Sequence, residues 1–112
     1  VSTIDDYARF CKMLLNKGEL DGTRILEPET VKLIMSNQLP ETATYENCRM
    51  GFGLSGAVDF ETGDYGLAGA ATTHYWINPK DQLIIITATQ IMPSNYKYAN
   101  EFKSIIDNNF TK

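Results

Sequence analysis

The stretch DYGLAGAATTHYWINP, residues 64–79, decides how the rest of the chain is interpreted. Its second half, from Thr73 to Ile77, is typical of a β-strand. Its first half is a run of very small residues: Gly66, Ala68, Gly69, Ala70 and Ala71. Small residues form strands poorly, because they offer little side chain to pack and Gly loses backbone entropy. The run therefore indicates either a tight turn or a place where another group lies against the backbone.

Strand signals flank this stretch on both sides. Apolar residues occupy alternate positions from Met50 to Phe60 and predict one strand with one buried face. The last strand, LIIITATQI, is apolar on both faces, so both sides of the sheet need cover. We expect an antiparallel meander of three to four strands, over residues 50–60, 64–69, 72–78 and 82–91.

Helix signals predict two helices before this sheet and one after it, over residues 3–17, 28–37 and 95–109. Thr3, with Asp6 three residues later, caps the first helix, and Pro28 begins the second. The closing helix is expected to pack on the sheet through an inner stripe: Tyr98, Phe102, Ile105 and Ile106. Together the signals predict an α+β fold in one segment, residues 1–112.

The composition excludes several classes of function. The chain has 112 residues and a formal net charge of −4 without a basic run, which argues against a nucleic-acid partner. No apolar run approaches the ~18 residues that a membrane span needs. Cys11 and Cys48 have neither a disulfide-framework nor a metal-site spacing, and Cys11 lies among apolar positions as a buried thiol would. We expect no metal and no cofactor.

Two further features favour structural interpretations. GFGLSG, residues 51–56, matches G-x-G-x-x-G, but a dinucleotide site needs those glycines between a strand and a helix, and no helix signal follows. His74 is the only histidine. A lone histidine in a half-buried strand is more often structural, and catalysis would need an acidic partner and a nucleophile close in space.

Nearly the whole chain resembles one family. Three segments carry the likeness: STIDDYARFCKMLLNKGELDGTRILEPETVKLIMSNQLP, GFGLSGAV, and GDYGLAGAATTHYWINPKDQLIIITATQIMP. They resemble the later part of the serine β-lactamase and penicillin-binding-protein superfamily, in its class C-like esterase or "β-lactamase-related" branch. The chain also begins VSTIDDY, without an initiator Met. We therefore expect the C-terminal portion of a larger β-lactamase-like fold.

The resemblance implies a serine hydrolase that acts through an acyl-enzyme. In this family the Ser of S-x-x-K attacks a carbonyl, the Lys and the Tyr of Y-x-N handle its proton, and a third motif lies on a strand beside the site. By position, Leu67, Ala68 and Gly69 resemble the third motif and would bind substrate. Ala70 would then offer its backbone N–H to the oxyanion hole, and the small residues would let an acyl group approach the strand.

Two departures narrow the expected substrate. Leu67 replaces the polar or aromatic residue that is typical of the motif's first position, so no charge meets a substrate carboxylate. Thr72 stands where a Gly is common in this branch. Both favour a small-molecule ester or amide, and an esterase or peptidase-like parent, over a β-lactam.

The other two motifs occur only out of order. SNYK, from Ser94 to Lys97, matches S-x-x-K, and Tyr45 and Tyr98 each begin a Y-x-N. In the family both motifs precede the third one, whereas Ser94 and Tyr98 follow it, and Ser94 is a suitable cap for the last helix. We expect that the nucleophile is absent and that the isolated chain is inactive.

Several questions stay open at this level. The alternative function is a non-catalytic sheet-and-helix module that binds a partner, and the apolar strand from Leu83 to Ile91 predicts self-association of the isolated chain through an open edge. The resemblance allows a periplasmic or cell-envelope location, although the chain has no signal peptide. The sequence does not identify the substrate.

Overall fold

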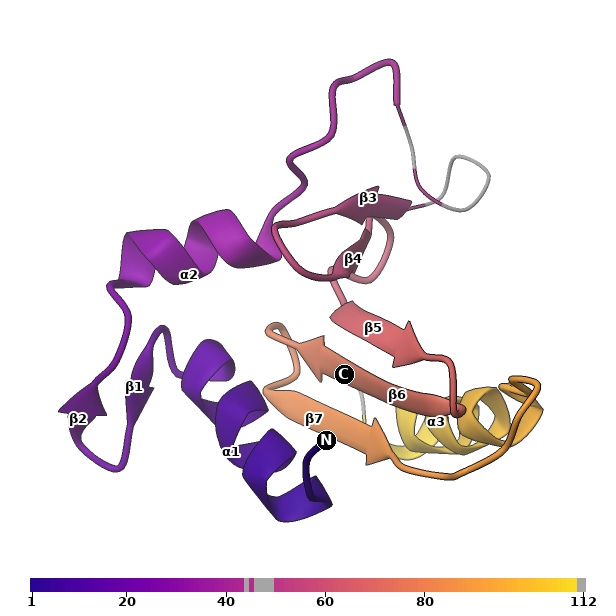
Figure 1. Ribbon diagram of the computed structural model, residues 1–112. Helices are drawn as coiled ribbons and strands as arrows, with labels where there is room; N and C mark the ends of the chain where they lie inside the picture. Colours follow the sequence, from indigo (N-terminus) through magenta and orange to yellow (C-terminus); the bar gives the residue numbers. More distant parts are fainter. Residues whose placement is uncertain (44, 46–49, 111–112) are drawn as a thin grey trace.

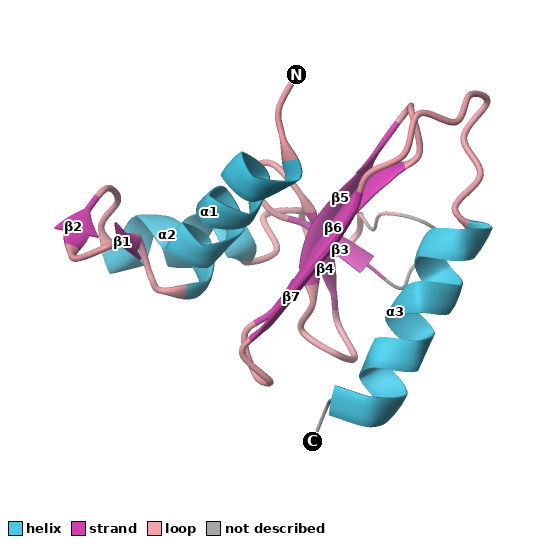
Figure 2. Ribbon diagram, turned by 90° about the horizontal axis from the view of Figure 1, so that it is seen from below, coloured by secondary structure: helices cyan, strands magenta, loops and turns pink. Residues whose placement is uncertain are grey.

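The computed structural model describes residues 1–43, 45 and 50–110, and its centre is a five-stranded antiparallel sheet (Figure 1). The strands lie side by side in chain order: β3 (Met50–Phe52), β4 (Ala57–Asp59), β5 (Tyr65–Gly69), β6 (Thr73–Asn78) and β7 (Leu83–Thr87). Helix α1 (Ile4–Leu15) covers one face and helix α3 (Lys97–Phe110) lies on the other (Figure 2). The predicted α+β meander is confirmed, with five strands instead of three to four.

The N-terminal elements form where local signals predict them. The Thr3 side chain accepts a hydrogen bond from the Asp6 N–H at 3.1 Å and so caps α1. Strands β1 (Glu19–Leu20) and β2 (Thr23–Arg24) then form a short hairpin. Its turn is Asp21-Gly22, with φ angles of 51° and 79°, the left-handed pair that a type I′ turn requires. Helix α2 (Pro28–Met35) begins at its proline.

The predicted single strand over residues 50–60 is wrong, because the chain reverses in its middle. Met50 pairs with Asp59 and Phe52 with Ala57, and the Gly53 N–H donates to the Gly56 carbonyl at 2.7 Å to close the turn. The alternating apolar residues therefore do not share one buried face, and Leu54 in the turn is exposed. The same reversal places GFGLSG in a hairpin with no helix after it, which does not fit a dinucleotide site.

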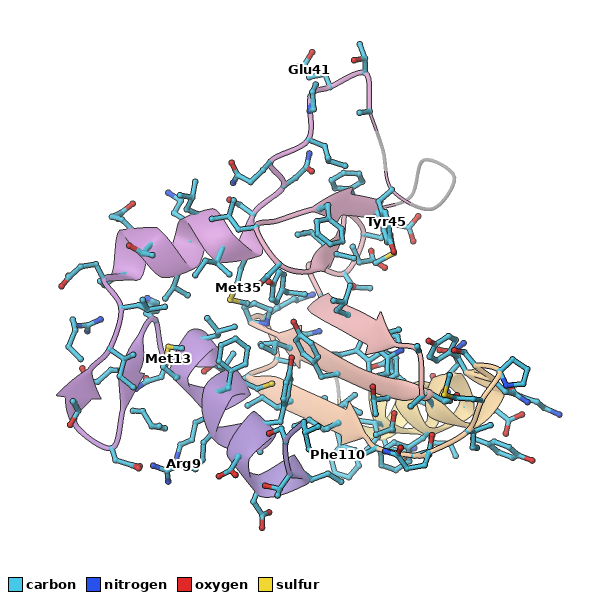
Figure 3. All side chains as sticks on the ribbon, viewed as in Figure 1. Arg9, Met13, Met35, Glu41, Tyr45 and Phe110 are labelled. Atoms are coloured by element: carbon cyan, nitrogen blue, oxygen red, sulfur yellow. The ribbon has the colours of Figure 1, made fainter. Side chains whose placement is uncertain are left out.

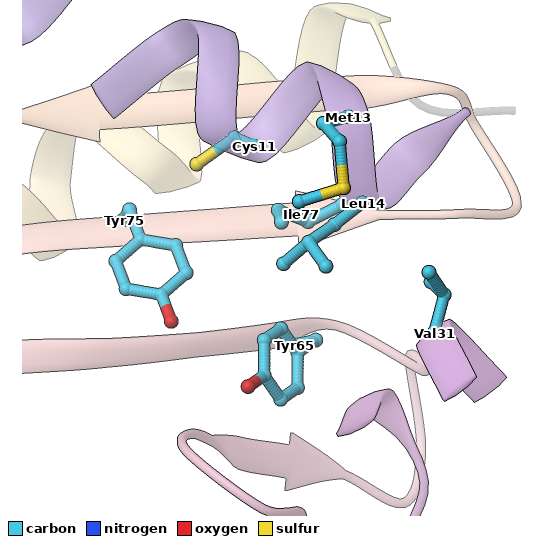
Figure 4. Packing of buried hydrophobic residues seen from close by; sticks show 7 residues of the cluster. All are labelled: Cys11, Met13, Leu14, Val31, Tyr65, Tyr75 and Ile77. Carbon is cyan, nitrogen blue, oxygen red and sulfur yellow. The ribbon is translucent and has the colours of Figure 1, made fainter. Parts of the chain in front are cut away.

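The core lies between α1, α2 and one face of the sheet (Figure 4). Its buried members are Cys11, Met13, Leu14, Val31, Tyr65, Tyr75 and Ile77. Cys11 is fully buried, as predicted, and burial raises the pKa of its thiol to about 11. Strand β7 packs on both faces, since Ile84 and Ile86 join this cluster while Ile85, on the opposite face, is also buried.

Helix α3 turns a different side to the sheet than its apolar stripe predicts. Tyr98, Phe102 and Ile105 are 67%, 46% and 61% exposed, and Ala99 is the buried residue of the helix. A partly buried ion pair holds the helix instead: the Lys103 ammonium lies 2.7 Å from Asp64, at the start of β5, and 5.9 Å from the centre of the Trp76 ring. Of the predicted stripe, Ile106 is half-buried, whereas Tyr98, Phe102 and Ile105 are exposed.

No helix in the described part of the chain is long and apolar enough to cross a membrane. In the same residues, no three His, Cys, Asp or Glu side chains come together as metal ligands.

Candidate active site

The small-residue run ends in the tight turn between β5 and β6. The Thr72 N–H donates to the Gly69 carbonyl at 3.0 Å. Neither Ala70 nor Ala71 has a positive φ, which makes this a type I turn, and Thr72 follows in the left-handed region at φ 63°. This combination joins two antiparallel strands through a three-residue loop. A tight turn is therefore one reason for the small residues.

The close approach of strand β6 is a second reason for the small residues. An added Cβ at Gly66 would collide with the Tyr75 carbonyl of β6, and one at Gly69 would collide with the Thr73 hydroxyl. Both glycines pair across the hairpin with β6, Gly66 with Trp76 and Gly69 with Thr73. The backbone of β6 thus occupies the space beside Gly66, and the Thr73 side chain occupies the space beside Gly69.

Residues 89–96 hold this turn from one side through its backbone carbonyls. Four consecutive carbonyls of the turn accept hydrogen bonds from this segment. The Tyr96 hydroxyl donates to the Gly69 carbonyl at 2.6 Å, and the Ser94 hydroxyl donates to the Ala70 carbonyl at 2.6 Å. The Ala71 carbonyl accepts from the Ile91 N–H (3.1 Å) and the Thr89 hydroxyl (3.2 Å), and the same hydroxyl donates to the Thr72 carbonyl at 2.9 Å. Because this segment turns toward the hairpin, β7 ends at Thr87 and not at residue 91 as predicted.

Thr72 connects the turn and the segment with its own side chain. A β-branched residue at positive φ is strained by about 1–3 kcal/mol. The Thr72 hydroxyl offsets part of this cost, because it donates to the Ile91 carbonyl at 2.8 Å and accepts from the Asn95 N–H at 3.0 Å. The side chain is buried, at 3% exposure. The departure from glycine noted in the sequence therefore has a structural role.

The outer edge of β5 is open beyond Gly66. Strand β4 pairs only with Tyr65 and Gly66, so Leu67, Ala68 and Gly69 have no strand partner on that edge among the described residues. The Ala70 N–H likewise donates to no described group. The peptide bond is planar and trans, so this N–H points opposite to the Gly69 carbonyl and therefore away from Tyr96. An unpaired strand edge and an unpaired N–H thus lie next to each other.

A cleft of about 490 Å³ lies between the N-terminal residues 1–7 and strands β5, β6 and β7. Leu67, Ala68 and Gly69 line it from β5, Tyr75 and Ile86 from the neighbouring strands, and Tyr7 from α1. The lining within the described residues contains no Asp, Glu, Lys or Arg side chain. The Val1 amino terminus and His74 also line it. Of the four consecutive residues predicted as site residues, Leu67, Ala68 and Gly69 line this cleft, and Ala70 follows them at the end of β5 without lining it.

His74 is packed between aromatic rings. Its ring stacks on Trp76 with the centroids 3.6 Å apart and meets the edge of the Tyr96 ring at 5.9 Å. Burial, helped by the Lys103 charge, lowers the pKa of His74 to about 4, so the imidazole is neutral at pH 7. Its Nδ1 atom is buried without a hydrogen-bond partner in the described residues. No carboxylate orients it as a general base, which agrees with a structural role.

The two out-of-order motifs do not form a catalytic pair. The Ser94 hydroxyl donates to the Ala70 carbonyl, and α3 starts only at Lys97, so Ser94 is not the predicted helix cap. The Asn95 side chain instead accepts the Lys97 N–H at 3.1 Å. Tyr98 is exposed on α3. Tyr45 packs beside β3 with its ring centre 5.1 Å from that of Phe52 (Figure 3), while the rest of its motif, and Cys48, lie outside the described residues.

The described residues form an antiparallel sheet with helices on both faces and an open edge on β5. The chain belongs to the beta-lactamase family, whose model matches residues 1–107. The resemblance noted in the sequence is confirmed.

Relatives of this chain are longer proteins. Protein Rv1367c of Mycobacterium tuberculosis is 31% identical over 111 residues, a match that covers 82% of this chain and 28% of that protein. A structure described as a 6-aminohexanoate-dimer hydrolase from Bacillus anthracis superposes with a TM-score of 0.74 at 27% identity, covering 96% of this chain and 29% of that one. Simvastatin synthase (LovD) from Aspergillus terreus shares the fold, with a TM-score of 0.74 at 19% identity over 95% of this chain and 34% of its own. The chain thus spans about a third or less of their length.

The position of His74 generates a prediction about pH. In the unfolded chain His74 binds a proton below about pH 6.5, whereas in the folded chain it does so only near pH 4. Unfolding therefore takes up a proton between these values, and the free energy of unfolding falls as the pH is lowered through that window. His74→Phe keeps an aromatic ring but cannot be protonated, so its melting temperature should fall less between pH 6.5 and pH 4 than that of the original chain. Parallel melting curves for the two proteins would contradict the prediction.

Proposed function

We propose that this segment supplies the oxyanion-binding strand of a serine hydrolase of the β-lactamase type, and that the nucleophile comes from outside these 112 residues. One observation supports this most directly. The Ala70 N–H has no acceptor among the described residues and lies at the end of an open strand edge, next to residues 67–69, which line a cleft. In acyl transfer, negative charge develops on the carbonyl oxygen of the tetrahedral intermediate, and a fixed backbone N–H stabilises it.

Leu67, Ala68 and Gly69 are proposed to bind the acyl part of the substrate. Their free edge offers backbone groups to an ester or amide, and their small or apolar side chains leave room for it. The cleft lining within the described residues contains no Lys or Arg side chain to pair with a substrate carboxylate. These features favour a small ester or amide with an uncharged acyl group, as for an esterase or a peptidase-like enzyme.

The isolated chain is predicted to be inactive. The one S-x-x-K serine, Ser94, donates its hydroxyl hydrogen to the Ala70 carbonyl and has no general base in the described residues to activate it. Purified chain incubated with p-nitrophenyl butyrate or nitrocefin should release chromophore at the rate of a buffer blank. Turnover that disappears in Ser94→Ala would show that Ser94 is a nucleophile and would refute this part of the proposal.

The role of Ala70 is best tested by removing its N–H without changing the turn. Ala70 is the second residue of a type I turn, a position where proline is favoured. In the full-length protein to which we propose this segment belongs, Ala70→Pro should lower kcat about 100- to 1000-fold, the cost of one oxyanion-hole donor. The melting temperature should change little. Ala70→Ser retains the N–H and serves as the control, with kcat near that of the original protein.

Two outcomes would contradict the assignment. If Ala70→Pro keeps its kcat, the Ala70 N–H does not bind the oxyanion. If Ala70→Pro and Ala70→Ser lose activity equally, the effect comes from the added side-chain atoms and not from the missing N–H.

Self-association of the isolated chain is a second proposal, and exposed apolar surface favours it. Strand β7 is the last strand of the sheet among the described residues, and α3 exposes the stripe of Tyr98, Phe102 and Ile105. An unpaired strand edge and an apolar helix face both favour contact with a second copy.

Charged substitutions on α3 test this association. Phe102→Lys combined with Ile105→Lys should make the chain more monomeric by light scattering, and both positions are exposed enough to accept lysine. Ile85→Lys on β7 is unsuitable, because Ile85 is buried and a charge there would disrupt the core. Leu33→Lys on α2, also at an exposed position, is the matched control and should leave association unchanged. A monomeric original chain at high micromolar concentration would refute the proposal.

A further inference from the structure

We propose that Tyr96 is a positioning residue: by binding the Gly69 carbonyl, its hydroxyl aims the Ala70 N–H at the reacting oxygen of the substrate. The inference rests on the function proposed above and extends it to a residue that carries no known motif. Its basis is the pattern of hydrogen bonds around one peptide unit of the turn.

Hydroxyl groups hold the carbonyls on both sides of the Ala70 N–H. The Gly69 carbonyl, which shares a rigid peptide plane with that N–H, accepts from Tyr96 at 2.6 Å. The next carbonyl, that of Ala70 itself, accepts from Ser94 at 2.6 Å. The N–H between them has no acceptor in the described residues. Two short hydrogen bonds therefore fix the direction of the Ala70 N–H.

The Tyr96 ring is itself held in place, which lets its hydroxyl act as a fixed point. The ring meets His74 edge-on at 5.9 Å, and His74 is stacked on Trp76. On the backbone side, the neighbouring Asn95 N–H donates to the Thr72 hydroxyl at 3.0 Å. The Tyr96 side chain is thus held by the contact of its ring with His74 and by the hydrogen bond of the adjacent residue, Asn95, independently of its bond to Gly69. A donor whose direction is fixed in advance stabilises a developing charge without reorganisation.

Tyr96→Phe in the full-length protein removes the hydroxyl and keeps the ring on His74. The Gly69–Ala70 peptide then has the Thr72 N–H as its remaining carbonyl partner and gains freedom to rotate. We expect kcat to fall about tenfold, since small misplacements at a reacting centre have effects of this order or larger. KM should change by less than about twofold. Affinity for a boronic acid, whose tetrahedral adduct resembles the intermediate, should fall by the same factor as kcat.

Tyr98→Phe is the matched control. It removes the same atom from the same short stretch of chain, but Tyr98 is exposed and makes no contact with the turn, so kcat and boronate affinity should stay unchanged. Ser94→Ala, which frees the Ala70 carbonyl, is a second test variant and should act in the same direction as Tyr96→Phe. It keeps the proposal testable if Tyr96→Phe fails to fold, as judged by its melting temperature.

A double substitution separates this proposal from the one on which it rests. If Tyr96 acts through the Ala70 N–H, then Tyr96→Phe should cost nothing more in a protein that already carries Ala70→Pro. An undiminished tenfold loss in that background would overturn the positioning role and leave the oxyanion role of Ala70 intact. Unchanged kcat in Tyr96→Phe alone would overturn it as well. If Ala70→Pro itself has no effect on kcat, both proposals fail.

Discussion

The turn from Gly69 to Thr72 is the constraint on which the rest of the site depends. Its four carbonyls all bind residues 89–96, a segment that begins just after the last strand. These bonds fix the end of β5, and the strand pairing of β5 with β6 carries that order into the centre of the sheet. The edge of β5 beyond Gly66 stays open because β4 pairs only with Tyr65 and Gly66.

Features with local causes could be predicted from the sequence. The cap at Thr3, the Asp21-Gly22 turn and the start of α2 at Pro28 each depend on residues within one turn of chain, and the structure has all three. The reversal inside residues 50–60 and the orientation of α3 depend on distant partners. Alternating apolar residues do not distinguish one strand from a hairpin, and an apolar stripe does not reveal that the Lys103–Asp64 ion pair sets which side of the helix meets the sheet.

The candidate site also has features that could be predicted from the sequence and features that depend on distant partners. The pattern of small residues and the family resemblance predict residues 67–70 as site residues, and Leu67, Ala68 and Gly69 line the cleft from the end of β5. Tyr96 and Ser94 were missed as contacts of this site, since their partners are backbone carbonyls 27 and 24 residues away. Every residue has a backbone carbonyl, so the residue types in a sequence do not show which carbonyl accepts a hydrogen bond. The sequence does offer one indication: Thr72 stands at a position where glycine is typical, and its hydroxyl hydrogen-bonds to residues 91 and 95.

The attachment of the turn to residues 89–96 also links it to a surface loop. Several side chains of that loop, including Met92 and Pro93, are exposed to solvent. Insertions or exchanges there would still shift the hydroxyls that bind the turn. The position of the turn can therefore change while the residues of β5 stay the same, through changes in the length and sequence of a loop at the surface.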